Sequence, residues 1–129
     1  MTQRPLLVVD DDRDARELIR RILGERGARV IVAASAAEAF ELVRESRPHL
    51  LLSDIGMPEE DGYDLIRKIR ALPPDQGGST PAVALTAFAR SEDRRRMFLA
   101  GYQMHVAKPV EPGELIAVCA AMLSQRAGS

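Results

Sequence analysis

The stretch Leu6-Leu7-Val8-Val9-Asp10-Asp11-Asp12 places three aspartates directly after a short apolar run. Such a run is typical of a buried strand, which we expect over Pro5–Asp10. Aspartate is a poor strand former and is costly to bury without a partner, so the cluster indicates a cation or a charged ligand beyond the strand. A helix cap is the alternative, because Asp12 is suited to begin the helix that follows.

The length and composition of the chain fit a single domain with one hydrophobic core. It has 129 residues, of which 46% are hydrophobic and 29% are charged, as in soluble globular proteins. A net charge of -1 gives no general attraction to nucleic acid or to anionic membranes, and no apolar stretch is long enough to span a bilayer. We therefore expect no direct nucleic-acid or membrane partner. The single Cys119 suits a reducing cytoplasm, where we expect the protein to reside.

Short apolar segments alternate with longer amphipathic ones along the chain. Near-continuous apolar strands that alternate with helices predict an α/β fold, in which a parallel sheet is covered on both faces. We expect strands at Pro5–Asp10, about Arg29–Ala33, Leu50–Asp54, Ala82–Thr86 and Met104–Ala107.

Helices are expected between and after these strands, and capping residues place their ends. The first presents an apolar face and stops at Gly27, because glycine favours a helix end. Ser35 and Glu38 form a capping box at the start of the second. Ser91 caps the fourth, and the last begins near Pro112. The apolar face of the first helix comprises Ala15, Leu18, Ile19, Ile22 and Leu23.

Four of the strands end in polar residues that can take part in chemistry. In a parallel sheet the crossover handedness places all carboxyl ends on one edge, and ligands bind beyond that edge. We therefore expect these side chains to meet, although they are far apart in the sequence. They are Asp10 with Asp11, Asp54, Thr86 and Lys108.

This set of side chains suits phosphoryl chemistry supported by a divalent cation. Clustered carboxylates are hard oxygen ligands for Mg²⁺, and an ionised Asp54 can act as a nucleophile toward phosphorus. Lys108 can neutralise the phosphoryl group, while the Thr86 hydroxyl and the Ala87 backbone N–H can donate hydrogen bonds to it. Taken singly, each has a simpler alternative: Asp54 can cap a turn, Thr86 can be an ordinary strand residue, and Lys108 can be a solvated lysine.

Four short motifs surround these residues. They are Val8-Val9-Asp10-Asp11-Asp12, Ser53-Asp54-Ile55-Gly56-Met57-Pro58 with Asp61-Gly62, Leu85-Thr86-Ala87, and Ala107-Lys108-Pro109. Together they resemble the receiver domain of two-component response regulators, over about residues 4–124. The resemblance implies one receiver domain over residues 1–129. It also implies a flavodoxin-like (CheY-like) doubly wound five-stranded parallel sheet, in the order 2-1-3-4-5, with five helices.

The resemblance assigns roles to the acids. It implies that Asp54 is the phosphoacceptor and that Mg²⁺ or Mn²⁺ is the cofactor. The implied metal ligands are Asp11, Asp54, the backbone carbonyl of Gly56, and Asp10, which acts partly through metal-bound water. Asp12 matches a position that is not a ligand, which leaves it as a helix cap.

The resemblance also assigns the phosphate-binding groups. Thr86, the backbone N–H of Ala87, and Lys108 are implied to bind the phosphoryl group. The bond between Lys108 and Pro109 is implied to be cis, which is uncommon for proline in general.

Two positions in this chain bear on the conformational switch that follows phosphorylation and on the lifetime of the phosphorylated state. His105 stands three residues before the lysine, where family members often carry Tyr or Phe, so the implied switch pair here is Thr86 and His105. Histidine titrates near neutral pH, which predicts an altered or pH-sensitive switch; an exposed histidine that never moves is the alternative. We expect Phe88, two residues after Thr86, to shield the acyl-phosphate from water.

The function that the resemblance implies is a phosphoacceptor module of a phosphorelay, with at most self-catalysed phosphorylation and dephosphorylation. A histidine kinase or a histidine phosphotransfer protein would supply the phosphoryl group. Phosphorylation would then shift the face formed by the fourth helix, the fifth strand and the fifth helix. A downstream or fused output domain would read this change. The loop Pro73-Pro74-Asp75-Gln76-Gly77-Gly78 is similar to that of receivers in hybrid sensor histidine kinases.

The alternative function is that of a phosphatase of the haloacid-dehalogenase type. Such an enzyme would use Asp10 as its nucleophile, and Asp10 and Asp12 formally fit the Asp-x-Asp pattern. The chain has no insertion for a substrate-binding cap, and Asp54 would have no role in this alternative. Turnover of phosphomonoesters separates the two functions.

Overall fold

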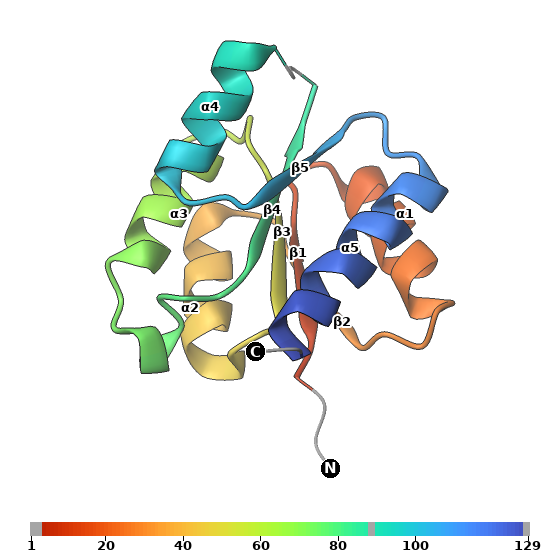
Figure 1. The fold of residues 1–129 in the computed structure, drawn as a ribbon, viewed down its shortest axis with the longest axis horizontal. Coiled ribbons are helices and arrows are strands. Elements are labelled where there is room, and N and C mark those ends of the chain that lie inside the picture. Colours follow the sequence, from red (N-terminus) through yellow and green to blue (C-terminus); the bar gives the residue numbers. More distant parts are fainter. Residues whose placement is uncertain (1–3, 88–89, 128–129) are drawn as a thin grey trace.

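The computed structural model describes residues 4–87 and 90–127, and within them five parallel strands form one sheet. The strands lie in the order β2-β1-β3-β4-β5, with helices on both faces (Figure 1). This order confirms the flavodoxin-like arrangement that the motifs implied. The strands are β1 Leu6–Val9, β2 Val30–Ala33, β3 Leu50–Asp54, β4 Ala82–Thr86 and β5 Met104–Ala107.

Five α-helices pack on the sheet in two layers within the described part of the chain. Helices α1 and α5 cover one face, and α2, α3 and α4 cover the other (Figure 1). A short 3-10 helix, η1, precedes β4. None of the helices in these ranges has the length and apolar character needed to cross a membrane. The bounds are α1 Arg13–Gly24, α2 Ala36–Ser46, α3 Gly62–Arg70, η1 Pro74–Gln76, α4 Ser91–Ala100 and α5 Pro112–Ala127.

Alternate residues of each strand fill two hydrophobic cores, one on each side of the sheet. Leu51 packs on the side of α2 and α3, whereas Leu50 and Leu52 pack on the side of α1 and α5. All three leucines are fully buried. Burial of each such side chain stabilises the fold by about 1.5–3 kcal/mol, so β3 is a firmly held base for the carboxylate at its end.

The predicted apolar face of α1 is correct at its centre and wrong at Leu18. Ile19 and Leu23 are buried against the sheet, but Leu18 remains 43% exposed. A helix turns by about 100° per residue, so Leu18 lies at the margin of a face that is centred on Ile19.

The ends of β1 and α1 follow local hydrogen bonds. Strand β1 stops one residue before the predicted end, because the Asp10 carboxylate turns to accept the N–H of Asp12 at 2.9 Å. Asp12 caps α1 as predicted, accepting the N–H of Asp14 at 3.0 Å. Gly27 closes the turn after this helix with a φ of 86°, and the N–H of Ala28 donates to the Leu23 carbonyl. The helix itself ends at Gly24, three residues before the predicted stop, and the left-handed Gly27 completes the turn that follows.

Two predicted caps differ from the observed ones. Ser35 caps α2, but the Glu38 carboxylate accepts the N–H of Ala34 at 2.7 Å, so the predicted capping box is not closed on Ser35 itself. Ser91 is the first residue of α4 and not its cap. Arg90 holds the cap position in extended backbone, because its N–H donates to the Asp93 carboxylate at 3.3 Å.

The loop between β3 and α3 holds one residue in a strained backbone conformation. Glu59 has a φ of 67°, in the left-handed region. For a residue with a Cβ atom this conformation costs about 1–2 kcal/mol. The loop therefore stores strain next to the carboxyl end of β3.

We predict that Glu59→Gly stabilises the protein by about 0.5–1 kcal/mol. Relief of the left-handed strain exceeds the extra unfolded-state entropy of glycine, about 0.4–1 kcal/mol. Urea unfolding measures the difference. Glu60→Gly is the control and should destabilise, because Glu60 has no positive φ and forms an ion pair with Lys68. A loss of stability in Glu59→Gly would show that the left-handed conformation carries no net strain here.

Candidate functional site

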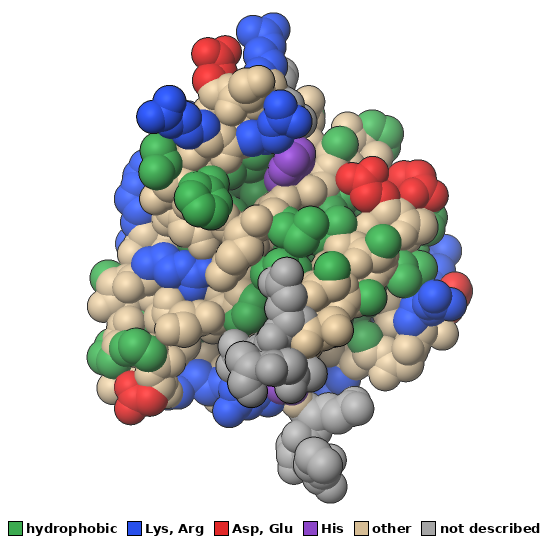
Figure 2. All heavy atoms as spheres, in the orientation of Figure 1, with side chains coloured by type: hydrophobic (Ala, Val, Ile, Leu, Met, Phe, Trp, Pro, Cys, Tyr) green, Lys and Arg blue, Asp and Glu red, His purple; other side chains and the backbone are tan. Residues whose placement is uncertain are grey.

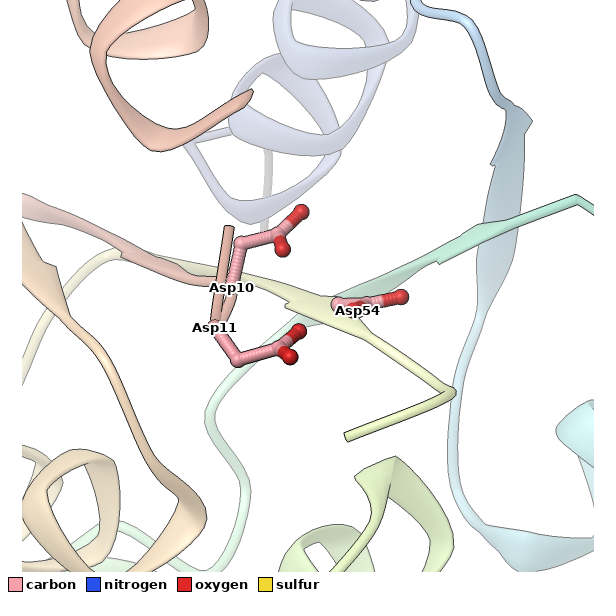
Figure 3. Close-up of side chains that lie close together, drawn as sticks. All are labelled: Asp10, Asp11 and Asp54. Carbon is pink, nitrogen blue, oxygen red and sulfur yellow. The ribbon is translucent and has the colours of Figure 1, made fainter. Parts of the chain in front are cut away.

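The carboxyl ends of β1 and β3 bring three carboxylates together beyond the sheet edge. Asp10 and Asp11 follow β1, Asp54 ends β3, and the two strands are neighbours. One carboxylate oxygen from each residue lies within 4.8 Å of the other two (Figure 3). The structure thus groups the three acids that the sequence analysis proposed for one site.

Asp54 is held at the centre of the sheet edge. It is 7% exposed, because β3 lies between β1 and β4. Its Oδ1 accepts the N–H of Gly56 at 3.3 Å, and the Ser53 hydroxyl donates to its backbone carbonyl at 3.0 Å. These bonds fix the side chain and the backbone of Asp54, which also lines a cavity at this edge of the sheet.

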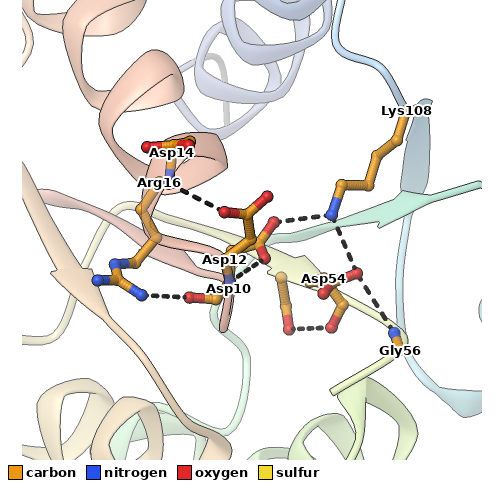
Figure 4. A network of polar contacts seen from close by, with 8 residues as sticks. Asp10, Asp12, Asp14, Arg16, Asp54, Gly56 and Lys108 are labelled. Carbon is orange, nitrogen blue, oxygen red and sulfur yellow. Dashed lines mark hydrogen bonds and ion pairs between the residues drawn. The ribbon is translucent and has the colours of Figure 1, made fainter.

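Lys108 reaches the acids from the end of β5. Its Nζ lies 2.8 Å from Asp10 Oδ2 and 3.4 Å from Asp54 Oδ1 (Figure 4). Its backbone N–H donates to the Thr86 carbonyl at 2.9 Å, and its bond to Pro109 is cis. A single ammonium group therefore neutralises part of two carboxylates, and Asp10 is the nearer partner.

The charges of the cluster shift the pKa values of Asp54 and Lys108 upward. Burial raises the pKa of the Asp54 carboxyl, and the Asp10 charge raises it further, while Lys108 and the N–H of Gly56 oppose the rise. Burial alone would lower the pKa of Lys108, but its bond to Asp10 and the charges of both acids outweigh this effect and raise it. Three carboxylates thus share a single nearby ammonium group at this edge of the sheet.

Two further polar residues bind backbone carbonyls near the site, and the sequence analysis did not identify them. Arg16 in α1 donates from Nη1 to the Asp10 backbone carbonyl at 2.9 Å (Figure 4). The Tyr102 hydroxyl donates to the Gly62 carbonyl at 2.8 Å, at the start of α3. Neither residue belongs to one of the four motifs, and a bond to a backbone carbonyl leaves no trace in the spacing of the sequence.

Thr86 and His105 lie on the same face of the sheet. In the register between β4 and β5, Thr86 pairs with Ala107 and Ala84 pairs with His105. Registered partners in parallel strands share a face, and Ala84 belongs to the core beneath α2 and α3. Thr86 is buried and His105 is half-buried. Phe88, which was expected to shield the acyl-phosphate, lies outside the described residues.

The groups around the cleft fit a small divalent cation. A cavity of about 400 Å³ is lined by the three acids together with Asp12, Ile55, Gly56, Thr86, Ala87 and Lys108. All of the candidate ligands offer oxygen, and Asp11 is exposed to solvent. Mg²⁺ prefers such a set, with few carboxylates and room for retained water. Asp12 faces the start of α1 and is not part of the three-carboxylate group.

We predict a pH-dependent effect of Asp54→Asn on stability in metal-free buffer. The pKa of Asp54 is raised above its ordinary 3.8 in the fold, so its ionised form disfavours folding. The wild type should therefore lose stability, relative to the variant, as pH rises from below 3.8 through the raised value. Urea unfolding with a chelator present measures this difference.

Asp12→Asn is the control, since it removes an exposed carboxylate that is outside the group of three acids. It shows how much of the effect comes from the loss of a carboxylate that is not one of the three acids. A difference between Asp54→Asn and the wild type that stays constant across pH would contradict the raised pKa.

Known proteins share both the sequence and the fold. The response regulator receiver domain family matches residues 6–120. A protein of Leptolyngbya boryana, described as an uncharacterized 14.6 kDa protein in the sodA1 3′ region, is 48% identical over 116 residues, which are 90% of this chain and 87% of that one. Response regulator Rre1 of Synechocystis sp. is 36% identical over 125 residues. These cover 96% of this chain but 53% of Rre1, so this chain spans about half of that relative.

The fold comparison agrees with the sequence comparison. The crystal structure of a CheY-like response regulator receiver domain protein from Methanospirillum hungatei JF-1 superposes with a TM-score of 0.87, at 27% identity, over 98% of both chains. Members of this family act as phosphoacceptor modules in signalling, and they typically bind Mg²⁺. The phosphatase alternative finds no support among these relatives. With its motifs, its strand order and its acidic edge all in agreement, the chain belongs to the receiver domains of two-component response regulators.

Proposed function

We propose that Asp54 accepts a phosphoryl group from a phosphohistidine and that the remaining site residues stabilise the product. The observation that carries this proposal is the convergence of three carboxylates within 4.8 Å, with the Lys108 ammonium 3.4 Å from Asp54. One domain carries this function, with its core over about residues 4–124. The activity is that of an acceptor, with at most self-catalysed phosphorylation and dephosphorylation.

In the transfer step, a carboxylate oxygen of Asp54 attacks phosphorus. The new O–P bond forms as the P–N bond of the phosphohistidine breaks, and the bonding pair leaves with the imidazole nitrogen, which takes up a proton. The transition state spreads negative charge over the phosphoryl oxygens, so positioning and charge neutralisation supply most of the catalysis. Asp54 is suited to this role because the bonds to Gly56 and Ser53 hold it in place.

Lys108, Thr86 and Ala87 bind the phosphoryl oxygens in this proposal. Lys108 already lies near Asp54, so a small movement away from Asp10 brings its ammonium to the added charge. Thr86 ends β4 beside Asp54, and Ala87 follows it at the rim of the cavity. The lysine thus exchanges a carboxylate for a phosphoryl partner.

Asp10, Asp11, Asp54 and the backbone carbonyl of Gly56 would hold Mg²⁺, or Mn²⁺ in its place. When bound, the cation neutralises charge on the carboxylates and on the incoming phosphoryl group. Asp10 is fully buried and already bonded to Lys108, which agrees with a role through metal-bound water. Asp11 is exposed, and its carboxylate already lies near Asp10 and Asp54.

Thr86 and His105 form the switch in this proposal. They occupy one face of β4 and β5, so movement of the Thr86 hydroxyl toward a phosphoryl group opens space that His105 can enter. The small side chains of Ala84 and Ala107 flank the path. Phosphorylation thereby biases a pre-existing equilibrium of α4 and β5.

The face formed by α4, β5 and α5 is the proposed output surface. Figure 2 shows basic side chains gathered over α4, acidic ones near the start of α5, and hydrophobic ones between them. Phe98 is 69% exposed and Met104 is 37% exposed on this side. A fused or separate output domain would bind here, and a histidine kinase or histidine phosphotransfer protein would donate the phosphoryl group. We place these partners, and this chain, in the cytoplasm.

Phosphorylation by acetyl phosphate or phosphoramidate in Mg²⁺ tests the central assignment. The wild type should gain the mass of one phosphoryl group and lose it slowly, whereas Asp54→Asn should gain none. Asp11→Asn should react at least about tenfold more slowly, because a lost metal ligand typically costs this much or more. Asp12→Asn should behave like the wild type. Rapid turnover of phosphomonoesters, or full uptake by Asp54→Asn, would support the phosphatase alternative instead.

His105→Ala should separate phosphorylation from its propagation. The variant should gain the phosphoryl group at close to the wild-type rate, because His105 does not line the cavity. The change in amide chemical shifts of α4 on phosphorylation should be reduced. Equal shift changes in variant and wild type would show that His105 takes no part in the switch.

A further inference from the structure

A buried tyrosine connects the end of α4 to the start of α3. Tyr102 is 2% exposed, and its hydroxyl donates to the Gly62 carbonyl at 2.8 Å. Its backbone N–H donates to the Met97 carbonyl of α4 at 3.0 Å. The same residue is therefore fixed to α4 by its backbone and to α3 by its side chain.

Gly62 in turn lies directly against the phosphoacceptor backbone. A Cβ atom at Gly62 would stand 2.6 Å from the Asp54 carbonyl oxygen and 2.8 Å from the Ile55 Cα atom, which no side chain allows. The N–H of Gly62 donates to the Ile55 carbonyl at 2.9 Å. Gly56, whose carbonyl is a proposed metal ligand, is the next residue after Ile55. The position of Gly62 thus constrains the backbone that carries both groups.

The Tyr102 hydroxyl acts as a hydrogen-bond donor to the Gly62 carbonyl. Burial raises the pKa of Tyr102, against an opposing effect of the Ser53 hydroxyl beside it, so the group stays protonated. Ser53 also donates to the Asp54 carbonyl. The Tyr102 hydroxyl therefore lies among the groups that hold the Asp54 backbone, although Tyr102 itself belongs to the turn after α4.

We propose that Tyr102 is a positioning residue for the acidic site. Through its bond to Gly62 it holds the start of α3 against Asp54 and Ile55, and it thereby sets the affinity of the site for Mg²⁺. The same bond carries a change at the site to the end of α4. This inference rests on the proposed function, since it takes the three acids and Gly56 to be the metal site.

Tyr102→Phe removes the hydroxyl and keeps the buried ring. Outer partners of metal ligands typically change affinity by about 10–100-fold. Because Tyr102 acts through Gly62 and Ile55, we expect a weakening of about threefold to tenfold in the Mg²⁺ dissociation constant. Isothermal titration calorimetry with Mg²⁺ measures it, on protein shown to be folded by circular dichroism.

Tyr63→Phe is the matched control. Tyr63 is the only other tyrosine in the chain, it lies in α3 next to Gly62, and its ring stacks on the Arg96 guanidinium. The Mg²⁺ affinity of the Tyr63→Phe variant should equal that of the wild type. Equal affinity in folded Tyr102→Phe would overturn the inference and leave the proposed function intact. Absence of Mg²⁺ binding by the wild type would overturn the proposed function, and the inference with it.

A second measurement does not depend on the folding of Tyr102→Phe. The chain has no tryptophan and two tyrosines, so Tyr63→Phe leaves Tyr102 as the single fluorophore of this kind. Its emission should change on addition of Mg²⁺, with the same midpoint as the calorimetric titration. An emission that stays constant through saturation would show that Tyr102 is uncoupled from the site.

Discussion

Three carboxylates, those of Asp10, Asp11 and Asp54, repel one another at the edge of the sheet. Burial also disfavours the charged form of Asp54. The fold holds the three acids together because Lys108 and backbone N–H groups offset part of this cost. The offset is incomplete, since the pKa of Asp54 remains raised. A site built in this way is suited to bind a cation, because a cation offsets this charge and the further charge that a phosphoryl group would add. The hydrophobic burial of β3 supplies the stability on which this strained arrangement depends.

The hydrogen bonds and ion pairs around the site also connect it to elements at the surface of the protein. Arg16 ties Asp10 to α1, Tyr102 ties the start of α3 to the end of α4, and Lys108 ties β5 to β1 and β3. Each of these bonds joins the acidic edge to an element that reaches the surface. We therefore propose that a change of charge at Asp54 affects several elements. Two of them, α4 and β5, belong to the proposed output face.

The sequence was sufficient to predict the strands and the meeting of the acids, because apolar runs and polar strand ends are recorded directly in the chain. The strand order, in contrast, came from the resemblance of the motifs to those of a known family. It was insufficient for contacts that one side chain makes with a distant backbone. Arg16 and Tyr102 bind carbonyl groups, which every residue possesses, so no partner residue marks them. Local competition explains the smaller errors: Asp93 accepts the Arg90 N–H and displaces Ser91 as the cap of α4, and Leu18 falls at the margin of a helical face.

The position of the acyl-phosphate tests the central claim most directly. Borohydride reduces an aspartyl phosphate to homoserine, which marks the acceptor permanently, and peptide mass spectrometry then locates it. After phosphorylation by a small phosphodonor in Mg²⁺, the account predicts homoserine at position 54 alone. Homoserine at position 10 would contradict it, because the acid cluster would then supply the nucleophile and Asp54 would be a bystander.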